Sequence, residues 1–521
     1  MIQQVRPAYV PQDASVTSDG LVCQFVIEPA ETTKTLRQLL ESDDLTFKMI
    51  DAAHDNGREF RLYYVFADTK LHTFIVVVLP LVDTIEFATI AHVIPAAGKY
   101  EDKLCELFGL HVTGRGPSQR MLLHENWPEN LHPLRKDVKW DMRPEPARGN
   151  YQFQVVSGEG IYEIPVGPIH AGIIEPAHFR ISVAGEEIVL LEPRLGFAHK
   201  GIEKLFEQLP LAKQIALSEK IAGDTSFSYS LAYCQAIESL AGILVEPEHG
   251  QARVLFSELE RLANHFGDIG GIMNDAGFNF GGAGGARLRE TILRLNDRLS
   301  GSRLLRGINT FGGVAIGLSP AQITDLQAEL PLVERDFEQV ISIAENSVTL
   351  LNRLKGTGAL ALDVAARFGM MGPVGRASGQ DVDVRRDFPY AGYGRLPSIS
   401  VPVETSGDVY ARFRVRVREV GNSFKVIDEV LSTMSSIVPL PSEKMIELCK
   451  NGLAIGCTEG WRGEILCVVH TNAEGVISRV AVRDPSFVNW LGVSEAVFGG
   501  VVPDFPLVNK SFGLSYSGND T

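Results

Sequence analysis

The stretch KIAGDTSFSYSLAYCQAIE, Lys220 to Glu238, joins a polar loop to an apolar helical pattern, and the fold is organised around it. Asp224 and Thr225 precede Phe227 and Leu231, which are spaced for one face of a helix. Polar residues directly before such a pattern indicate a helix N-terminus. We therefore expect a helix to begin near Thr225 and to dock its apolar face on a core.

The length and composition outside this stretch predict a folded protein of two or three domains. The chain has 521 residues, of which 45% are hydrophobic and 22% are charged. Its 50 Gly and 27 Pro are dispersed, so low complexity is not indicated.

The formal net charge of -15 argues against nucleic acid as a main partner, because binding to phosphates needs clustered positive charge. One basic run is present, RFRVRVRE from Arg412 to Glu419. Its alternation predicts a strand with the arginines on one face. A structural or ion-paired role is favoured over a ligand site.

The six cysteines do not form a CxxC pair, so a metal framework of thiolates is not predicted. The N-terminus shows no signal-peptide pattern, and we expect a reducing, cytoplasmic location. The longest apolar run, Phe74 to Val82, has nine residues. A bilayer span needs about 20. Any membrane association is therefore expected to come through partners.

The N-terminal part has the pattern of a small α/β domain. Apolar residues alternate from Arg58 to Phe66, turn residues follow, and Phe74 to Leu79 is an apolar β-branched run, which predicts a hairpin. Tyr100 to Phe108 has helical spacing and is followed by Gly109. Pro, Gly and charged residues then predict a boundary. We assign residues 1–145 to this domain, 146–166 to a linker and 167–521 to a second domain.

Helical patterns dominate the second domain, with extended segments between and after them. The fold class expected for the whole chain is α+β, with a small α/β domain followed by a large helix-dominated domain with β additions. The expected helices are Leu255 to Phe266, Leu288 to Leu299 before Gly301, one starting at Ser319 and Pro320 and running toward Lys355, and Phe424 to Met434; the expected extended segments are Val401 to Val417 and Glu464 to Val482.

Two stretches of the first domain resemble a known family. These are YEDKLCELFGLHVTGRG, Tyr100 to Gly116, and LHPLRKD, Leu131 to Asp137. They are similar to the C subunit of bacterial NADH:quinone oxidoreductase, complex I, and to its counterpart in membrane-bound nickel-iron hydrogenases.

The second domain continues this resemblance over nearly its whole length. It looks like the complex I D subunit and, more closely, the large subunit of formate-hydrogenlyase-type hydrogenases of the hydrogenase-4 type. The order C then D in one chain matches fused subunits of that group. The stretches are GPIHAGIIEPAHFRIS (167–182), LGFAHKGIEKL (195–205), ELERLANH (258–265), GRASGQDVDVRRDFPYAGY (375–393) and RDPSF (483–487).

The family's hydrogenases hold nickel and iron with two CxxC pairs. Aligned on the shared residues, Ala222 and Thr225 stand in place of the first pair, and Ser486 and Asn489 in place of the second. Alanine cannot ligate, and a hydroxyl or an amide replaces a bridging thiolate poorly. The sequence therefore argues against a nickel-iron centre, and we expect no metal ligand among these residues.

Other parts of the hydrogenase pocket match. The resemblance implies that Glu175 is a proton-transfer glutamate, that Arg462 lies over the former metal position and that Asp484 lies beside the lost ligands. A carboxylate relays protons when burial lifts its pKa toward neutrality. In this role Arg462 would stabilise a negative substrate or intermediate. For the carboxylates, a salt bridge or a helix cap is an equally weighted alternative.

The quinone site of complex I matches in part. His170 corresponds to the first histidine of the quinone loop, and Asp275 to the acidic partner of the quinone histidine. The second histidine of the loop has no clear counterpart. Gly223 replaces the family's tyrosine, so Tyr229 is a candidate substitute, and a packed tyrosine is its alternative.

Some weaker patterns favour structural roles. GGAGGARLRE, Gly281 to Glu290, lacks the features of a phosphate loop or a dinucleotide site, so a tight turn is favoured over an anion cradle. Cys467 and His470 fit a strand. His199 and His265 fit hydrogen-bonded structural histidines. The chain has no NAD fingerprint, although its family name would imply NAD.

Two hypotheses follow. In the first, the chain is the large catalytic-type subunit of a membrane-associated, energy-converting oxidoreductase complex on the cytoplasmic face of the inner membrane. Its partners would be integral membrane subunits and a small iron-sulfur subunit that carries the cluster, with quinone a candidate ligand. In the second, it is a non-catalytic structural or coupling subunit that keeps only fold and interfaces. A feature that discriminates between them is whether Glu175, Arg462 and Asp484 converge on one solvent-reachable cavity beside Ala222 and Ser486.

Overall fold

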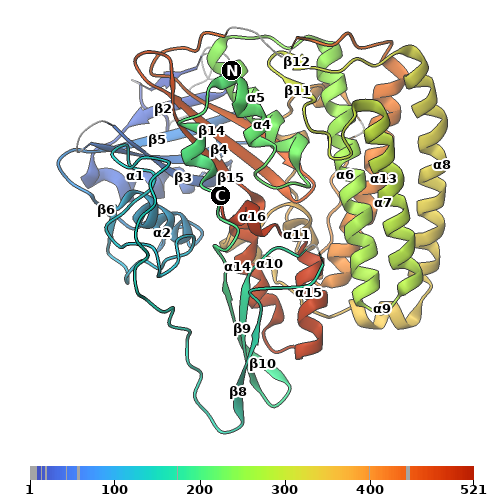
Figure 1. Ribbon diagram of the computed structural model, residues 1–521, viewed down its shortest axis with the longest axis horizontal. Helices are drawn as coiled ribbons and strands as arrows, with labels where there is room; N and C mark the ends of the chain where they lie inside the picture. Colours follow the sequence, from blue (N-terminus) through green and yellow to red (C-terminus); the bar gives the residue numbers. More distant parts are fainter. Residues whose placement is uncertain are drawn as a thin grey trace.

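The computed structural model describes residues 9–12, 14–17, 20–42, 44–55, 59–172, 174–397, 399–441 and 446–521. A sheet-rich N-terminal part is followed by a helix-rich part that carries further small sheets (Figure 1). The predicted α+β class is confirmed.

The N-terminal part is a five-stranded sheet with helices against it. Its strand order is β1-β2-β5-β4-β3. The predicted hairpin is the antiparallel pair β4 and β5, in which Phe66 lies opposite Ile75. The predicted helix is α2, and Gly109 ends it with a φ of 69°. The elements are β1 (Ser15–Val16), β2 (Val22–Val26), α1 (Thr32–Leu40), β3 (Leu45–His54), β4 (Phe60–Asp68), β5 (Thr73–Leu81), β6 (Glu86–Ala88), α2 (Ala97–Phe108) and β7 (His111–Thr113).

An irregular segment and a three-stranded arm separate this sheet from the helices. Residues 142–157 contain no helix or strand, whereas β8 (Ile161–Val166) lies at the end of the predicted linker. It pairs with β9 (His178–Ala184), which pairs with β10 (Glu187–Arg194). This arm projects at the bottom of Figure 1.

Long helices form the opposite half of the molecule, and every helix that the sequence predicts for the second domain is present. Ser319 begins α8 as part of a capping box with Gln322. The predicted run toward Lys355 is divided into α8 and α9. The elements are α3 (Ile202–Phe206), α4 (Leu211–Ser218), α5 (Ser226–Ala241), α6 (Pro247–Asp275), α7 (Asn279–Ser300), β11 (Asn309–Thr310), β12 (Gly313–Val314), α8 (Pro320–Glu345), α9 (Val348–Leu354), α10 (Leu362–Arg367), α11 (Gly372–Ala377), α12 (Val384–Asp387) and α13 (Val409–Thr433).

The basic run Arg412 to Glu419 is helical, so the predicted strand is wrong. It lies in α13, where Asp408 caps the first turn by accepting a hydrogen bond from the Ala411 amide. Helical spacing puts Arg412 and Arg416 on one buried face, where Arg416 pairs with Asp268 at 3.1 Å. The alternation of arginine and valine suggested a strand, but the side chains follow the period of a helix. The ion-paired role is confirmed for Arg416.

The glycines of Gly281 to Glu290 lie within the first turns of α7, so the predicted tight turn is also wrong. A Cβ atom added to Gly285 would lie 2.6 Å from the Cα of Gly270 on α6. The glycines therefore allow two helix backbones to approach closely.

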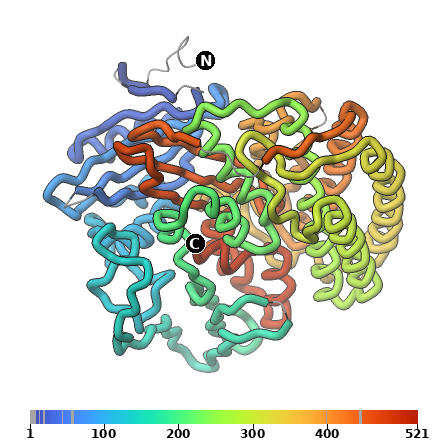
Figure 2. Tube along the Cα trace, turned by 45° about the horizontal axis from the view of Figure 1, so that its top comes forward, coloured from blue at the N-terminus to red at the C-terminus, as the bar shows by residue number. Residues whose placement is uncertain are grey.

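The chain then returns to its N-terminal sheet (Figure 2). The strands β13, β14 and β15 form an antiparallel sheet whose residues share a hydrophobic core with β3, β4 and β5. Buried ion pairs join the two sheets, Lys48 to Glu464 at 2.5 Å and Arg479 to Asp51 at 2.8 Å. The last elements are β13 (Leu453–Gly460), β14 (Gly463–Thr471), β15 (Ile477–Arg483), α14 (Pro485–Val497), α15 (Phe505–Phe512) and α16 (Tyr516–Asn519).

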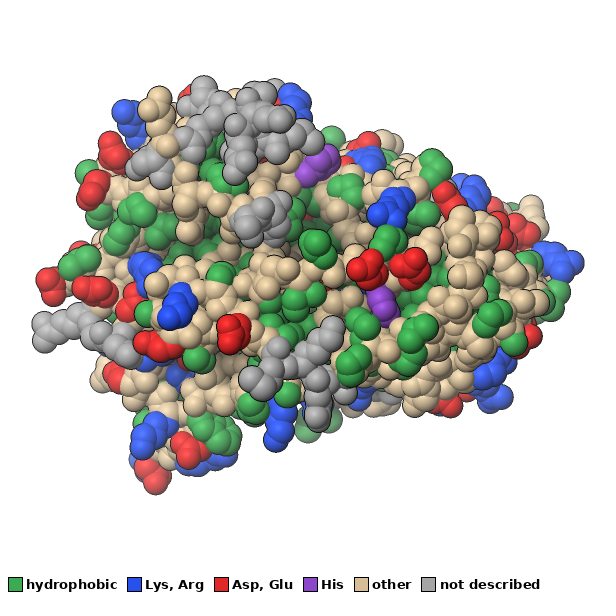
Figure 3. All heavy atoms as spheres, turned by 90° about the horizontal axis from the view of Figure 1, so that it is seen from above, with side chains coloured by type: hydrophobic (Ala, Val, Ile, Leu, Met, Phe, Trp, Pro, Cys, Tyr) green, Lys and Arg blue, Asp and Glu red, His purple; other side chains and the backbone are tan. Residues whose placement is uncertain are grey.

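Acidic and basic side chains are interspersed on the face shown in Figure 3, and no continuous basic stripe crosses the described part of that face. No helix among the described residues is both long enough and apolar enough to cross a bilayer.

Candidate functional site

A cavity of about 560 Å³ lies between the loop before β9, the start of α5, α6 and the C-terminal helices. Four predicted site residues line it: His170, Glu175, Asp275 and Arg462. Ala222, at a lost ligand position, also lines it. Further lining residues include Val166, Phe179, Asp224, Asn264, Gly267, Asp268, Arg289, Trp461, Phe505, Lys510, Leu514 and Ser517.

The polar residues at the lost ligand positions all have partners within the protein. Thr225 donates to Asp224 at 2.8 Å and accepts from the Trp461 indole at 3.1 Å. The Ser486 hydroxyl accepts from the Ser515 amide at 2.9 Å.

The fourth position, Asn489, is held by a backbone segment. Its Oδ1 accepts from the Met371 amide at 3.0 Å, and its Nδ2 donates to the Met371 carbonyl at 3.1 Å. The side chain thus pairs with both polar groups of one residue, in the manner of a strand partner.

Arg462 is held in the cavity wall by a two-pronged ion pair. Its Nη1 and Nη2 donate to the two oxygens of Asp224 at 2.8 and 2.7 Å, and its Nε donates to the Gly513 carbonyl at 2.5 Å. Burial opposes ionisation of Asp224, but Arg462 outweighs it and holds the pKa of that carboxyl below its usual value. The charge of Arg462 is therefore compensated by Asp224, which the sequence indicated only as part of a helix N-terminus.

Glu175 is a half-buried carboxylate with neutral donors. It accepts from the amides of Tyr516 and Ser517 at 3.1 and 3.0 Å and from the Ser517 hydroxyl. No cation within the described residues forms an ion pair with it. Its two carboxylate oxygens therefore anchor the segment that closes one side of the cavity.

Asp484 lies behind this wall rather than among the lining residues. It caps α14 by accepting from the Ser486 amide at 2.5 Å, and the Tyr229 hydroxyl donates to its other oxygen. Burial, together with the nearby carboxyls of Asp224 and Glu175, raises the pKa of Asp484 to about 7. The helix-cap alternative is observed, and the predicted convergence of Glu175 and Arg462 on one cavity does not extend to Asp484.

Tyr229 is buried, with 1% of its surface exposed, and its hydroxyl has Asp484 as an internal acceptor. This is the packed-tyrosine alternative. His170 does line the cavity, and its Nε2 lies 2.8 Å from the Ala177 carbonyl. Asp275 is at the end of α6, and burial raises the pKa of its carboxyl against the opposing charge of Lys510. Neither a hydrogen bond nor an ion pair joins His170 to Asp275.

The sequence analysis missed Glu260, which caps α5. Its carboxylate accepts from the amides of Phe227 and Ser228 at 2.7 and 3.1 Å, whereas the side chain of Thr225 makes no cap bond. Burial raises the pKa of Glu260 to about 7. The sequence signal that could have identified Glu260 is an acidic residue on the buried face of the helix that contains ELERLANH.

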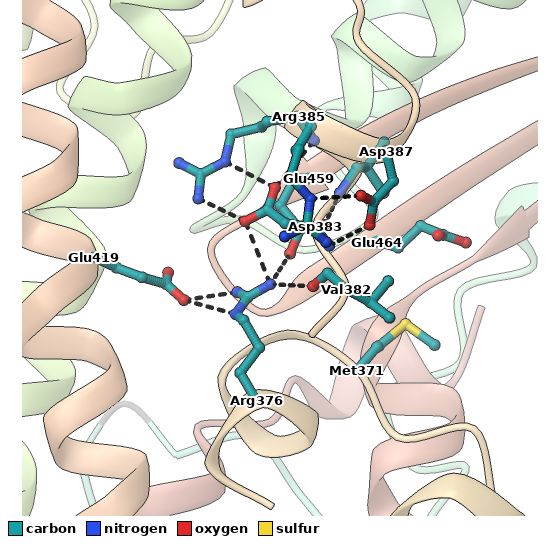
Figure 4. Close-up of polar contacts among 12 residues, drawn as sticks. Met371, Arg376, Val382, Asp383, Arg385, Asp387, Glu419, Glu459 and Glu464 are labelled. Carbon is teal, nitrogen blue, oxygen red and sulfur yellow. Dashed lines mark hydrogen bonds and ion pairs between the residues drawn. The ribbon is translucent and has the colours of Figure 1, made fainter. Parts of the chain in front are cut away.

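Two family motifs meet in a buried charge network away from the cavity (Figure 4). Arg376 lies between Glu419 on α13 and Glu459 on β13, at 2.7 and 2.9 Å. Arg385 binds Asp383 at 2.7 Å. The remaining members are Glu258, which pairs with Arg385 and Arg261, and His265, whose Nε2 lies 2.7 Å from Glu419.

His265 is therefore a structural histidine, as predicted, and so is His199, whose Nδ1 lies 2.7 Å from the Asp520 carbonyl. Cys467 and His470 lie on β14, as predicted. Within the described ranges, no three His, Cys, Asp or Glu side chains are grouped so that they could hold a metal ion.

Comparisons with known proteins match both parts of the chain. Residues 25–144 match the family described as the respiratory-chain NADH dehydrogenase 30 Kd subunit, and residues 275–452 match the 49 Kd subunit.

Three curated relatives cover most of the chain. Formate hydrogenlyase subunit 5 of Escherichia coli is 30% identical over 84% of this chain and 77% of its own length. Hydrogenase-4 component G of Escherichia coli is 30% identical over 89% and 81%. The C/D subunit of NADH-quinone oxidoreductase from Bacteroides fragilis is 29% identical over 77% and 79%.

Proposed function

Because this chain belongs to the family of fused C/D-type subunits that includes formate hydrogenlyase subunit 5, hydrogenase-4 component G and the C/D subunit of NADH-quinone oxidoreductase, we propose that it is the large subunit of a membrane-associated, energy-converting oxidoreductase complex. In this proposal the complex works without a nickel-iron centre. The chain lines a cavity that holds a ligand. A partner protein supplies this ligand with electrons, and the ligand exchanges protons with the chain.

The observation that carries the proposal is the convergence of Glu175, Arg462 and Ala222 on one cavity. The residues of the family pocket that match lie together there. The residues that replace the metal ligands form hydrogen bonds within the protein. Thr225, Ser486 and Asn489 are each engaged by a neighbouring group. A nickel-iron centre needs soft thiolate ligands, and these residues supply none.

In the proposed mechanism, Glu175 passes protons between the cavity and the protein interior. Its carboxylate lies on the wall, and its interior neighbours Ser517 and Tyr516 supply only neutral donors. Asp484 is buried and has a pKa of about 7. It is the interior group that holds the proton. Arg462 acts differently from the sequence expectation. Because Asp224 neutralises it, it keeps the wall in shape instead of attracting an anion.

The proposed partners are integral membrane subunits and a small iron-sulfur subunit that holds the cluster, with this chain peripheral on the cytoplasmic face of the inner membrane. Quinone is the candidate acceptor, because His170 and Asp275 both line the cavity. A quinone would supply a two-electron, two-proton acceptor there.

The second candidate function is a structural coupling subunit without redox chemistry. The internal use of the lost ligand positions and the neutralised Arg462 favour it. The structural function differs from the redox function in one measurable respect: in the structural function, Glu175 has no part in turnover.

The native complex, purified through this chain after gentle solubilisation, tests both functions. We expect iron-sulfur signals by electron paramagnetic resonance, oxidation of those signals by an added quinone, and no stoichiometric nickel. Nickel in a one-to-one ratio would overturn the proposed metal-free cavity. Loss of all clusters and redox partners would favour the structural function.

A pair of variants locates the effect in the cavity. Glu175→Gln removes the titratable group and is expected to slow quinone-linked turnover at least tenfold. The matched control is Glu186→Gln, because Glu186 is exposed on the turn between β9 and β10. Equal turnover in both variants would remove Glu175 from the mechanism.

A further inference from the structure

Among the described residues, two cations line the cavity without an ion-pair partner. The wall includes Arg289 from α7 and Lys510 from α15. No hydrogen bond or ion pair joins either side chain to another described residue, and Arg289 acts on Asp224 only from beyond ion-pair distance. Arg462 is paired, whereas these two charged groups remain available to something inside the cavity.

The sequence of α6 places these cations side by side. Gly267 and Gly271 are four residues apart on the same face of α6, about 6 Å along the axis. A Cβ atom added to Gly267 would lie 2.9 Å from the Arg289 Cδ, and one added to Gly271 would lie 3.1 Å from the Lys510 Cδ. The two aliphatic stems therefore cross α6 at neighbouring turns, in space that only glycine leaves open.

The carboxylates of the same cavity are held by other groups. Asp224 pairs with Arg462 and Asp268 with Arg416. Glu175 accepts from backbone amides and a hydroxyl. Asp275 is the remaining lining carboxyl, and Lys510 acts on it only from beyond ion-pair distance. Within the described lining, the two cations Arg289 and Lys510 have no ion pair, and Asp275 is the carboxyl that is left without a strong partner.

Part of the remaining cavity surface is apolar. It includes Val166, Phe179, Phe505 and Leu514, and its volume of about 560 Å³ lies within the range of small-molecule sites. A ligand that satisfied this lining would have an apolar body and an anionic head.

We propose that Arg289 and Lys510 bind the oxyanion head, a carboxylate or phosphate monoester, of an amphiphilic anion whose apolar body occupies the cavity. The guanidinium offers a planar fork that matches two oxygens of such a head, and the ammonium adds a point charge beside it. The inference goes beyond the proposed function, because a carboxylate or phosphate head is a ligand class other than the quinone proposed for the same cavity.

Titration calorimetry on the full chain tests the inference with decanoate and decyl phosphate as anionic probes and decanol as the neutral probe. We expect both anions to bind at least tenfold more tightly than decanol. Arg289→Gln and Lys510→Gln should each weaken anion binding about tenfold and leave decanol unchanged. Equal affinity for anions and decanol would overturn the proposal.

The matched control is Arg294→Gln, which removes the same charge from α7 at an exposed position paired with Glu290. It should bind the anions like the natural chain. A loss as large as that of Arg289→Gln would show that net charge, and not this site, attracts the anion, and would overturn the proposal. Gly267→Ala supplies a second approach, because it displaces the Arg289 stem without removing a charge. Its anion affinity should fall, whereas an unchanged affinity would contradict the site.

Two further arms identify the source of the head group. Binding to vesicles that contain phosphatidic acid, whose head is a phosphate monoester, abolished by Arg289→Gln, would assign the head to a membrane lipid. Binding of soluble decyl phosphate or decanoate without vesicle binding would assign it to a free metabolite, and absence of both would overturn the inference. Quinone-linked turnover that depends on Glu175 but not on Arg289 would leave the proposed function standing while this inference failed.

Discussion

The charge network around Arg376 and the region behind the cavity wall around Asp484 both bury carboxyl groups, but with different partners. In the network, Asp383, Glu258 and Glu419 each contact a guanidinium. Glu175 on the cavity wall, and the buried Glu260 and Asp484 beyond it, accept hydrogen bonds from amides and hydroxyls, and none of the three forms an ion pair among the described residues.

The partners decide how these groups hold protons. Burial opposes the charge of Asp383, but Arg385 and Arg376 outweigh it and lower its pKa to about 2. Burial of Asp484 and Glu260, neither of which has an ion-pair partner among the described residues, raises the pKa of each to about 7. The network is thus a permanently ionised support for the fold, whereas the carboxyls behind the cavity wall can take up and release protons near neutral pH.

Glu459 is the exception within the network, because burial and the nearby Asp383 raise its pKa to about 7. The network contains four carboxyls but only three arginines. One carboxyl is therefore left without a full countercharge.

The largest expected effect comes from removing a cation of the network. Arg376→Met leaves Glu419 and Glu459 buried with fewer countercharges, which should cost about 3–5 kcal/mol of apparent stability. Urea unfolding at pH 7 measures the loss. The control Arg298→Met breaks an exposed pair with Glu329 and should change stability by less than about 1 kcal/mol. Similar losses in the two variants would break the comparison.

Asp383→Asn should lower stability by about 2–3 kcal/mol at pH 7, since Arg385 loses its two-pronged partner. The folded-state pKa of Asp383 lies below its unfolded value, so its ionic stabilisation is present above about pH 4 and fades as the pH falls toward 2. Thermal unfolding at pH 6 and pH 3 should show a smaller difference between variant and natural chain at pH 3. A difference that grows with acid would contradict the assignment.

Asp484→Asn should show the opposite pH dependence. The folded-state pKa of Asp484 is raised, so the folded protein holds the extra proton between about pH 4 and 7, and stability falls by up to about 1.4 kcal/mol per pH unit through that window. The variant removes this loss. Its thermal midpoint relative to the natural chain should therefore rise from pH 5 to pH 7.5, and a constant difference would show that Asp484 does not titrate there.

The smallest expected effect is that of Tyr229→Phe. The Tyr229 hydroxyl donates to Asp484, and a donor favours the ionised carboxylate. Its removal should cost about 1 kcal/mol at pH 8 and less at pH 5, where Asp484 is already protonated. Equal losses at both pH values would point to packing alone.

The sequence predicted the helices with clear apolar stripes and terminal glycines, such as α2 and α7, because those signals are local. It failed for Arg412 to Glu419, where arginines and valines alternate as in a strand. Distant residues stabilise the helix there, because Ser511 and Asp268 accept hydrogen bonds from the inward guanidinium groups of Arg412 and Arg416. Tertiary contacts of that kind leave no mark on local spacing.

Like the fold, the candidate site could be predicted only in part from the sequence. Resemblance identified Glu175 and Arg462, and the structure places both on one cavity. It did not reveal that Asp224 would neutralise Arg462, or that Glu260 would cap α5 from 33 residues away. Those partners depend on which helix faces which, and a sequence pattern does not contain that geometry.

The core shared by the N-terminal sheet and the strands β13 to β15 has a consequence for assembly. Lys48 and Asp51 are translated before their partners Glu464 and Arg479, which follow 416 and 428 residues later. Until then, the first sheet must expose charges that it later buries. Covalent linkage gives the two halves a high effective concentration for each other and a fixed one-to-one ratio. Separate expression of the two halves should therefore yield an interface whose formation depends on protein concentration.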